Sequence, residues 1–190
     1  MINPNNRVIL ISGANRGIGL SIAKFLSKEG YTLSLGSRNI KKLDLVTKDF
    51  PKERTLLIKY DALIKDDPKS WIKKTIKRFN RVDGVINNAG IAKPAFNIED
   101  DDENNFDRMI KINMKGPLRL LRHAMPYLKK SGEGRVINIA SLSGKRVKNP
   151  NVGYSMTKFA VVALTHTVRQ QGWKYGIRAT ALCPSFVRTD

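Results

Sequence analysis

The chain has 190 residues, 41% of them hydrophobic, which suits a single domain with a substantial core. No apolar run approaches the roughly 18 residues that a membrane span needs, and no apolar signal region follows the first residues, so we expect a cytoplasmic protein that does not contact membranes. The one cysteine, Cys183, excludes a disulfide within the chain and a thiolate metal site.

A net charge of +19 is also typical of proteins that bind nucleic acid, in which clustered Lys and Arg neutralise phosphates. Here the basic residues are scattered, because pairs such as Lys41-Lys42 and Lys129-Lys130 fall in separate segments. We interpret the charge as a solvated, lysine-rich surface and expect no specific nucleic-acid partner. The rival interpretation is a basic scaffold that binds DNA or RNA.

Short β-branched runs alternate along the chain with longer segments of helical periodicity. Strands are predicted at 7–11, 31–35, 55–60, 82–87, 135–140 and 177–183. Helices are predicted at 18–28, 40–49, 68–79, 106–128 and 152–172, with a bend at Gly116-Pro117 in the fourth of them. The alternation predicts one α/β domain over residues 1–190, a doubly wound, Rossmann-like parallel sheet of six strands with helices on both faces.

Directly after the first predicted strand, the sequence reads SGANRGIG at residues 12–19. Glycines at this place allow a tight turn and let the backbone approach a pyrophosphate, which the free N–H groups of the next helix then bind. Because the turn lies between a strand and a helix, a dinucleotide-binding role is favoured over a flexible glycine loop. The expected cofactor contacts are Gly13, Asn15, Arg16, Gly17, Ile18 and Gly19.

The end of the second predicted strand distinguishes between the two nicotinamide cofactors. A carboxylate there binds the ribose 2′-hydroxyl, whereas an arginine accommodates a 2′-phosphate. The sequence has Ser37 and Arg38 with no carboxylate, and Arg16 supplies a second guanidinium, a group that binds phosphate through paired donors. We predict NADP(H) in preference to NAD(H). The simpler alternative is a pair of surface arginines in a chain rich in basic residues.

Tyr154 and Lys158 are four residues apart in the last predicted helix, so their side chains share a face. A lysine cation beside a phenol favours the ionised form, which can act as a base. Ser141 lies thirteen positions before the tyrosine, and its hydroxyl would hold a carbonyl oxygen. Alone this pattern is weak, because many helix surfaces carry a tyrosine and a lysine at this spacing.

Several motifs in order resemble the short-chain dehydrogenase/reductase family over nearly the whole chain. The turn at 12–19 has the family's G-x-x-x-G-x-G spacing, and NNAG at 87–90 is similar to its N-N-A-G segment. Asn113 stands where the family has a helix asparagine. Ser141, Tyr154 and Lys158 match the catalytic serine and the Y-x-x-x-K motif of the family.

By this resemblance the protein transfers a hydride between NADP(H) and a carbonyl or secondary alcohol. Tyr154 would be the acid and base, Lys158 would favour the tyrosinate and bind the nicotinamide ribose, and Ser141 would donate to the substrate oxygen. Asn113 would hold a water that links Lys158 to solvent. The structural alternatives are a strand cap for Ser141, a helix-kink bond for Asn113 and a solvated helix position for Lys158. Further implied cofactor contacts are Asp61, Asn88, Ala89, Gly90, Pro184, Val187 and Thr189.

The resemblance constrains substrate and assembly less closely. Lys93, Lys145, Arg146 and Lys148 lie near two expected pocket walls. These cations would favour an acidic or carrier-bound acyl substrate, as in 3-oxoacyl reductases of the family, although we prefer the general lysine excess as their explanation. The resemblance also implies a homodimer or homotetramer formed through the helices at 106–128 and 152–172.

The last residues, CPSFVRTD at 183–190, resemble the family's P-G-x-V-x-T segment, with Ser185 in place of the usual glycine. Members of the family usually continue past this segment into a substrate-covering helical region and a seventh strand. We therefore expect a domain that lacks this region. A cofactor-binding protein without turnover is then the alternative function.

Overall fold

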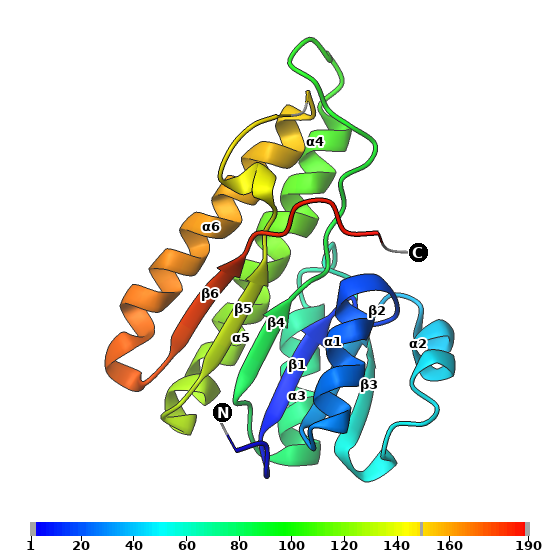
Figure 1. The fold of residues 1–190 in the computed structure, drawn as a ribbon, viewed down its shortest axis with the longest axis vertical. Coiled ribbons are helices and arrows are strands. Elements are labelled where there is room, and N and C mark those ends of the chain that lie inside the picture. Colours follow the sequence, from blue (N-terminus) through cyan, green and yellow to red (C-terminus); the bar gives the residue numbers. More distant parts are fainter. Residues whose placement is uncertain (1–2, 149, 189–190) are drawn as a thin grey trace.

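The computed structural model describes residues 3–148 and 150–188, which form a six-stranded parallel sheet between two layers of helices (Figure 1). The strands are β1 (Val8–Ser12), β2 (Thr32–Ser37), β3 (Thr55–Lys59), β4 (Gly84–Asn87), β5 (Arg135–Ile139) and β6 (Arg178–Leu182). The helices are α1 (Gly17–Lys28), α2 (Ile40–Val46), α3 (Asp67–Phe79), α4 (Asn104–Met109), α5 (Gly116–Ser131) and α6 (Val152–Gly172). The spatial order β3-β2-β1-β4-β5-β6 confirms the predicted doubly wound fold.

The central strand β1 shows why these apolar runs form this sheet. All five of its residues are buried, as expected for a parallel strand with helices on both faces. Successive side chains point to opposite faces of a strand. Leu10 therefore joins the core beneath α3, α5 and α6, while Ile11 joins the core beneath α1 and α2.

Trp71 of α3 fixes the carboxyl half of β2. The indole ring packs so closely on Gly36 that a Cβ there would come within 2.6 Å of it. The indole N–H donates to Ser34 Oγ at 2.8 Å, and this oxygen also lies 2.8 Å from Thr75 Oγ1. The buried N–H group is thereby satisfied, and α3 is held against β2.

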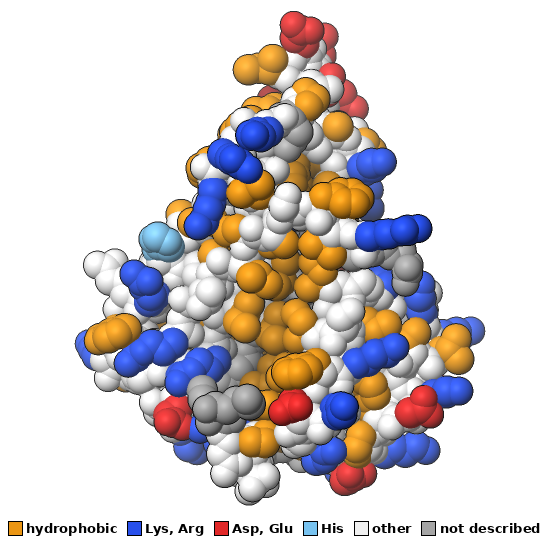
Figure 2. Space-filling view, in the orientation of Figure 1, with side chains coloured by type: hydrophobic (Ala, Val, Ile, Leu, Met, Phe, Trp, Pro, Cys, Tyr) orange, Lys and Arg blue, Asp and Glu red, His pale blue; other side chains and the backbone are white. Residues whose placement is uncertain are grey.

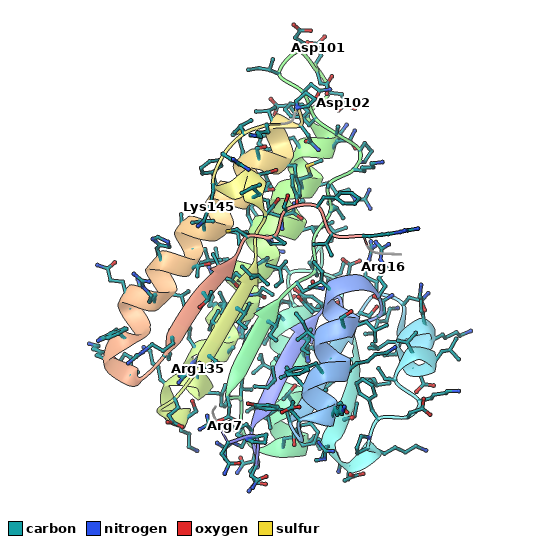
Figure 3. All side chains as sticks on the ribbon, in the orientation of Figure 1. Arg7, Arg16, Asp101, Asp102, Arg135 and Lys145 are labelled. Atoms are coloured by element: carbon teal, nitrogen blue, oxygen red, sulfur yellow. The ribbon has the colours of Figure 1, made fainter. Side chains whose placement is uncertain are left out.

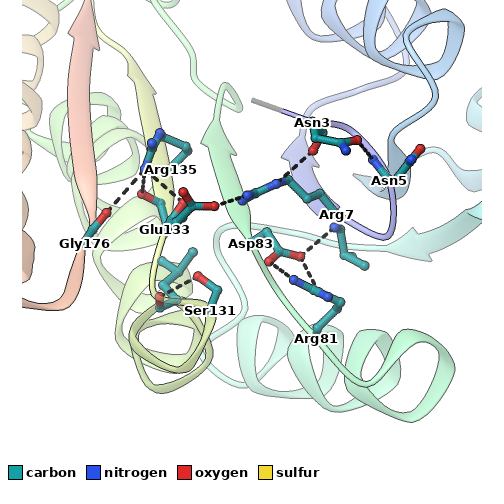
Figure 4. A network of polar contacts seen from close by, with 12 residues as sticks. Asn3, Asn5, Arg7, Arg81, Asp83, Ser131, Glu133, Arg135 and Gly176 are labelled. Atoms are coloured by element: carbon teal, nitrogen blue, oxygen red, sulfur yellow. Dashed lines mark hydrogen bonds and ion pairs between the residues drawn. The ribbon is translucent and has the colours of Figure 1, made fainter. Parts of the chain in front are cut away.

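Charged side chains join three segments at the amino-terminal edge of the sheet (Figure 4). Arg81 donates to both oxygens of Asp83, at 2.8 and 2.7 Å, and Asp83 also accepts the Val8 N–H at 2.9 Å. Arg7 pairs with Glu133 on the turn before β5. The hydrogen bond from Arg81 to Asp83 raises the pKa of the guanidinium. This network ties β1, β4 and β5 together at the edge opposite the glycine turn.

The predicted helix at 106–128 is interrupted. α4 passes into a π-helical segment, Ile110–Lys115, and α5 begins at Gly116. The Gly116 N–H donates to Lys111 O, five residues back. The irregularity therefore lies ahead of the predicted bend. Pro117 sits in the first turn of α5, directly after the π-helical segment, and has no N–H to donate to a carbonyl of that segment.

Helices α1 and α2 cover only half of their face of the sheet, and the other half is open. In Figure 1 this half consists of β5 and β6, and Figure 2 shows apolar side chains along the middle of the same face. Leu182 of β6 is 46% exposed on this face. Within residues 3–148 and 150–188, no helix is long and apolar enough to cross a membrane.

Candidate functional site

The carboxyl ends of β1, β2, β3 and β4 open into a cleft with a volume of about 790 Å³. This is the edge at which ligands bind in open α/β sheets. Many of the predicted cofactor residues line the cleft: Gly13, Asn15, Arg16, Gly17, Ile18, Ser37, Arg38, Asp61, Asn88, Ala89 and Gly90. Figure 3 places Arg16 on the turn between β1 and α1.

The glycine turn is tight because its backbone contacts leave no room for side chains. Gly13 has φ +68° and donates its N–H to Gly36 O at 2.8 Å. A Cβ at Gly19 would lie 2.4 Å from both Gly13 O and Asn88 Nδ2. Gly19 does not line the cleft, so its part is to let α1 approach the turn rather than to contact a ligand.

Asn88 and Ser12 lock this turn to the end of β4. Asn88 Nδ2 donates to Ser12 O at 3.0 Å and to Gly13 O at 3.1 Å. In return, Ser12 Oγ accepts the N–H groups of Asn88 and Ala89, both at 3.0 Å. The sequence analysis missed this role of Ser12. A hydroxyl residue at the last position of β1 is the only signal in the sequence that pointed to it.

Charge in the cleft is strongly positive. Asp61 is the one carboxylate among its lining residues that the structure describes, and its Oδ1 accepts the Leu63 N–H at 3.0 Å. The cationic lining residues are Arg16, Arg38, Lys41 and Lys59. The sequence analysis did not predict Lys41 or Lys59. Lys59 pairs in register with Ser37, and this strand register is what brings it to the cleft.

Lys158 lies at the inner end of the site. Its side chain is only 6% exposed, so it is not the solvated helix position of the structural alternative. Nζ donates to Ile139 O at 2.8 Å and lies 5.5 Å from the centroid of the Tyr154 ring. Burial lowers the pKa of the ammonium to about 8, with Cys183 acting in the opposite direction. The structure thus brings the two predicted residues together.

Gly90 connects this pair with the cleft. It lines the cleft, and a Cβ at Gly90 would lie 3.6 Å from Lys158 Nζ and 3.3 Å from Asn113 Oδ1. Asn113 lies in the π-helical segment and is 1% exposed. Its Oδ1 accepts the Ile91 N–H and its Nδ2 donates to Ile91 O, both at 2.8 Å. Nδ2 also donates to Thr157 Oγ1 at 3.1 Å. Asn113 therefore joins the end of β4 to α6.

Ser141 begins the short turn after β5, and its Oγ accepts the Ser143 N–H at 3.1 Å. Leu142 N–H donates to Pro184 O at 2.8 Å, which holds the segment after β6 against this turn. Figure 1 shows that segment crossing the carboxyl ends of the strands. Pro184 and Val187 are not among the cleft-lining residues. The predicted contact Thr189 lies outside the described residues.

Asn151 is a further site residue that the sequence analysis missed. It caps α6, and its Oδ1 accepts the Tyr154 N–H at 3.1 Å and the Phe96 N–H at 3.2 Å. Its Nδ2 donates to Ala92 O at 2.8 Å. One side chain thus holds the loop after β4 against the turn that carries Tyr154. An asparagine three residues before the tyrosine is a cap signal that could have been recognised.

The fold and the cleft define a Rossmann-like nucleotide-binding protein. A profile of the short chain dehydrogenase family matches residues 7–190, and the chain belongs to this family. Two solved structures illustrate the likeness. A 3-ketoacyl-(acyl-carrier-protein) reductase from Brucella melitensis complexed with NADH is 28% identical, with a TM-score of 0.91 over 96% of this chain and 77% of that one. An alcohol dehydrogenase from the archaeon Thermococcus sibiricus complexed with 5-hydroxy-NADP is 31% identical, with a TM-score of 0.88 over 95% of this chain and 77% of that one.

Curated relatives include an agropine synthesis reductase from Rhizobium rhizogenes, which is 45% identical over 184 residues. These residues cover 96% of this chain but 42% of the relative, so the chain spans less than half of that protein. An uncharacterized oxidoreductase from Staphylococcus saprophyticus is 33% identical over 192 residues, covering 100% of this chain and 78% of the relative.

Proposed function

We propose that this protein is an oxidoreductase that transfers a hydride between NADP(H) and a carbonyl or secondary alcohol substrate. The observation that carries the proposal is the buried ammonium of Lys158, which lies beside the Tyr154 ring and next to Gly90 of the cleft. Burying a lysine cation is unfavourable. Groups perturbed in this way, next to a specific partner and a cleft, are concentrated at functional sites.

The residues of the cleft fit a dinucleotide with a phosphate on its adenosine ribose. The glycine turn after β1, with Gly13 and Gly17 lining the cleft, suits a pyrophosphate, and Arg16 and Arg38 supply guanidinium groups. A bound nicotinamide supplies or accepts the hydride. Because one structural neighbour carries NADH and another 5-hydroxy-NADP, the preference for NADP(H) rests on the residues of this chain, with NAD(H) as the alternative.

Each catalytic residue then has a defined task. Tyr154 gives its proton to the forming alkoxide, and the Lys158 charge favours the tyrosinate that remains. Ser141 Oγ accepts the Ser143 N–H, which leaves its own proton for the substrate oxygen. The π-helical segment around Asn113 passes beside Lys158 and would hold the water through which the ammonium exchanges protons with solvent.

The test begins with titration of NADPH and NADH against the purified protein, followed by turnover of a panel of ketones. We expect tighter binding of NADPH, and we expect Tyr154→Phe to leave NADPH affinity nearly unchanged while removing turnover. Retained turnover in this variant would refute the role of Tyr154, and tighter binding of NADH would refute the NADP preference. NADPH binding with no turnover of any substrate would favour a cofactor-binding protein.

A 3-oxoacyl thioester is a second candidate substrate within the same reaction. Four exposed cations favour it, namely Lys93, Lys145, Arg146 and Lys148. Figure 3 shows Lys145 at the carboxyl end of the sheet. If the cations recruit an acidic carrier or thioester, the preference for thioesters over neutral ketones will fall as salt is added. A preference that is independent of salt would contradict this assignment.

We also propose a homodimer or homotetramer that packs through α5 and α6. The support is a set of exposed apolar side chains on these helices, Leu118 at 42%, Met156 at 52% and Phe159 at 43%. Oligomers commonly bury such positions. Light scattering should give a mass of two or four chains, and Phe159→Glu should lower it to one.

A further inference from the structure

Lys59 ends β3, the strand at the outer edge of the sheet. It pairs in register with Ser37, the last residue of β2. Two residues earlier in each strand, Leu35 belongs to the core beneath α1 and α2 and Leu57 packs against that core. Because side chains alternate along a strand, Ser37 and Lys59 face this same side, where both line the cleft.

Two more cations reach this corner of the cleft from other segments. Arg38 directly follows β2, and Lys41 lies in the first turn of α2. Arg38, Lys41 and Lys59 are all exposed, and among the described residues none of them forms an ion pair with a carboxylate. Ser37 Oγ accepts the Asn39 N–H at 3.2 Å, so its own proton can be donated to an anion.

The balance of charge points to the kind of ligand. Four cationic residues and one carboxylate among the described lining residues leave the cleft with a net charge of +3. Asp61 Oδ1 accepts the Leu63 N–H, and among the described residues Asp61 forms no ion pair with Arg38, Lys41 or Lys59. Like charges gathered around one hollow repel each other, and a dianion relieves the repulsion, whereas a ribose hydroxyl does not.

We propose that Lys59 is a specificity-determining residue that binds the 2′-phosphate of NADP(H) together with Arg38. The proposal rests on the proposed function, because it assigns a residue to the adenosine end of the same cofactor. A lysine contacts phosphate as a compact point charge on a flexible stem, so it can reach from β3 without the fixed geometry of an arginine fork. Lys59 distinguishes the two cofactors because only one of them carries a charge at this place.

The experiment measures dissociation constants for NADPH and NADH by fluorescence titration, with no need for a substrate. Lys59→Met removes the charge, Lys59→Arg restores it, and Lys52→Met is the matched control, because Lys52 is an exposed lysine in the turn ahead of β3. One charged contact to phosphate, partly screened by solvent, corresponds to about tenfold in affinity. We expect Lys59→Met to weaken NADPH about tenfold and NADH less than about twofold. Lys59→Arg and Lys52→Met should resemble the wild type.

Competition by 2′,5′-ADP and 3′,5′-ADP identifies which ribose phosphate is held. Only the 2′ isomer should lose affinity in Lys59→Met, whereas an equal loss for both isomers would overturn the assignment to the 2′-phosphate. An equal loss of NADPH and NADH, or no loss of either, would also overturn it. If the wild type itself binds NADH more tightly, the proposed cofactor fails. If the wild type prefers NADPH and the Lys59→Met variant keeps the full preference, only the proposed role of Lys59 is refuted.

Discussion

Replacing Lys158 by methionine is expected to stabilise the fold while removing turnover. Lys158 is 6% exposed, and burial lowers the pKa of its ammonium from 10.5 to about 8. One pKa unit corresponds to about 1.4 kcal/mol, so at neutral pH, where the group is protonated in both states, burying the charge costs about 3 kcal/mol. Methionine removes this cost. It also removes the hydrogen bond to Ile139 O, and a buried carbonyl without a partner costs about 1–2 kcal/mol. The net expectation at pH 7 is a gain of about 1–2 kcal/mol in the free energy of unfolding.

The gain should vanish as the pH rises. Between the native pKa near 8 and the unfolded value of 10.5, the unfolded wild type binds more protons than the native wild type. Raising the pH through this window therefore stabilises the wild type and leaves the methionine variant unaffected. Below about pH 8 the variant exceeds the wild type in free energy of unfolding by the largest amount. Near pH 10.5 only the destabilising loss of the hydrogen bond to Ile139 O remains.

Urea unfolding of both proteins at pH 7, 8, 9 and 10 measures the difference directly, because other titrating groups cancel between them. Lys24→Met, at an exposed position of α1, is the matched control and should show no such trend with pH. A Lys158→Met variant that is less stable than the wild type by the same amount at every pH would refute the argument. It would mean that the cost of burying the charge is fully compensated, so that the pKa of the ammonium is the same in the native and unfolded states.

Two further substitutions test local geometry. Asn151→Asp keeps the oxygen that accepts the Tyr154 N–H but loses the donor to Ala92 O, so hydrogen exchange in the loop at 91–96 should accelerate about fivefold, the equivalent of about 1 kcal/mol. Unchanged hydrogen exchange would contradict this role of the Asn151 side chain. Gly19→Ala places a Cβ 2.4 Å from Gly13 O. It should destabilise the fold by about 2 kcal/mol or more and weaken NADPH binding at least about tenfold, because the turn must shift. Calorimetry and nucleotide titration measure both effects, and wild-type values would refute the close contact.

Most of the sheet could be predicted from local pattern. Residues 8–11 are all apolar, three of them β-branched, and a strand in the middle of a parallel sheet needs that pattern. The strand prediction missed Ser12, whose backbone still pairs with Gly36 while its hydroxyl serves the turn. Serine has no strong strand preference, so only the neighbouring strand decides where β1 ends.

Pairwise spacing along one helix predicted the meeting of Tyr154 and Lys158, because an interval of four residues is set by helix geometry alone. The burial of Lys158 could not be predicted in this way. It depends on the end of β5, where Ile139 O accepts the ammonium, and on Gly144, where a Cβ would come within 2.6 Å of Lys158 O. Both contacts join segments that are distant in sequence. Lys59 could not be predicted as a cleft residue for the same reason, because its place in the cleft follows from its register with Ser37.

Asn113 shows how a backbone irregularity changes the task assigned to a motif residue. Its Nδ2 has two protons, and both are donated, one to Ile91 O and one to Thr157 Oγ1. Its Oδ1 already accepts the Ile91 N–H, so the side chain is committed to joining the end of β4 to α6. A π-helical turn bonds residues five apart and disturbs the regular pairing of its carbonyl groups, a feature common at functional sites. The water of the proposed relay is therefore better placed on a backbone carbonyl of this segment than on the Asn113 amide. On this argument, the asparagine acts by holding the π-helical segment and α6 in place beside Lys158.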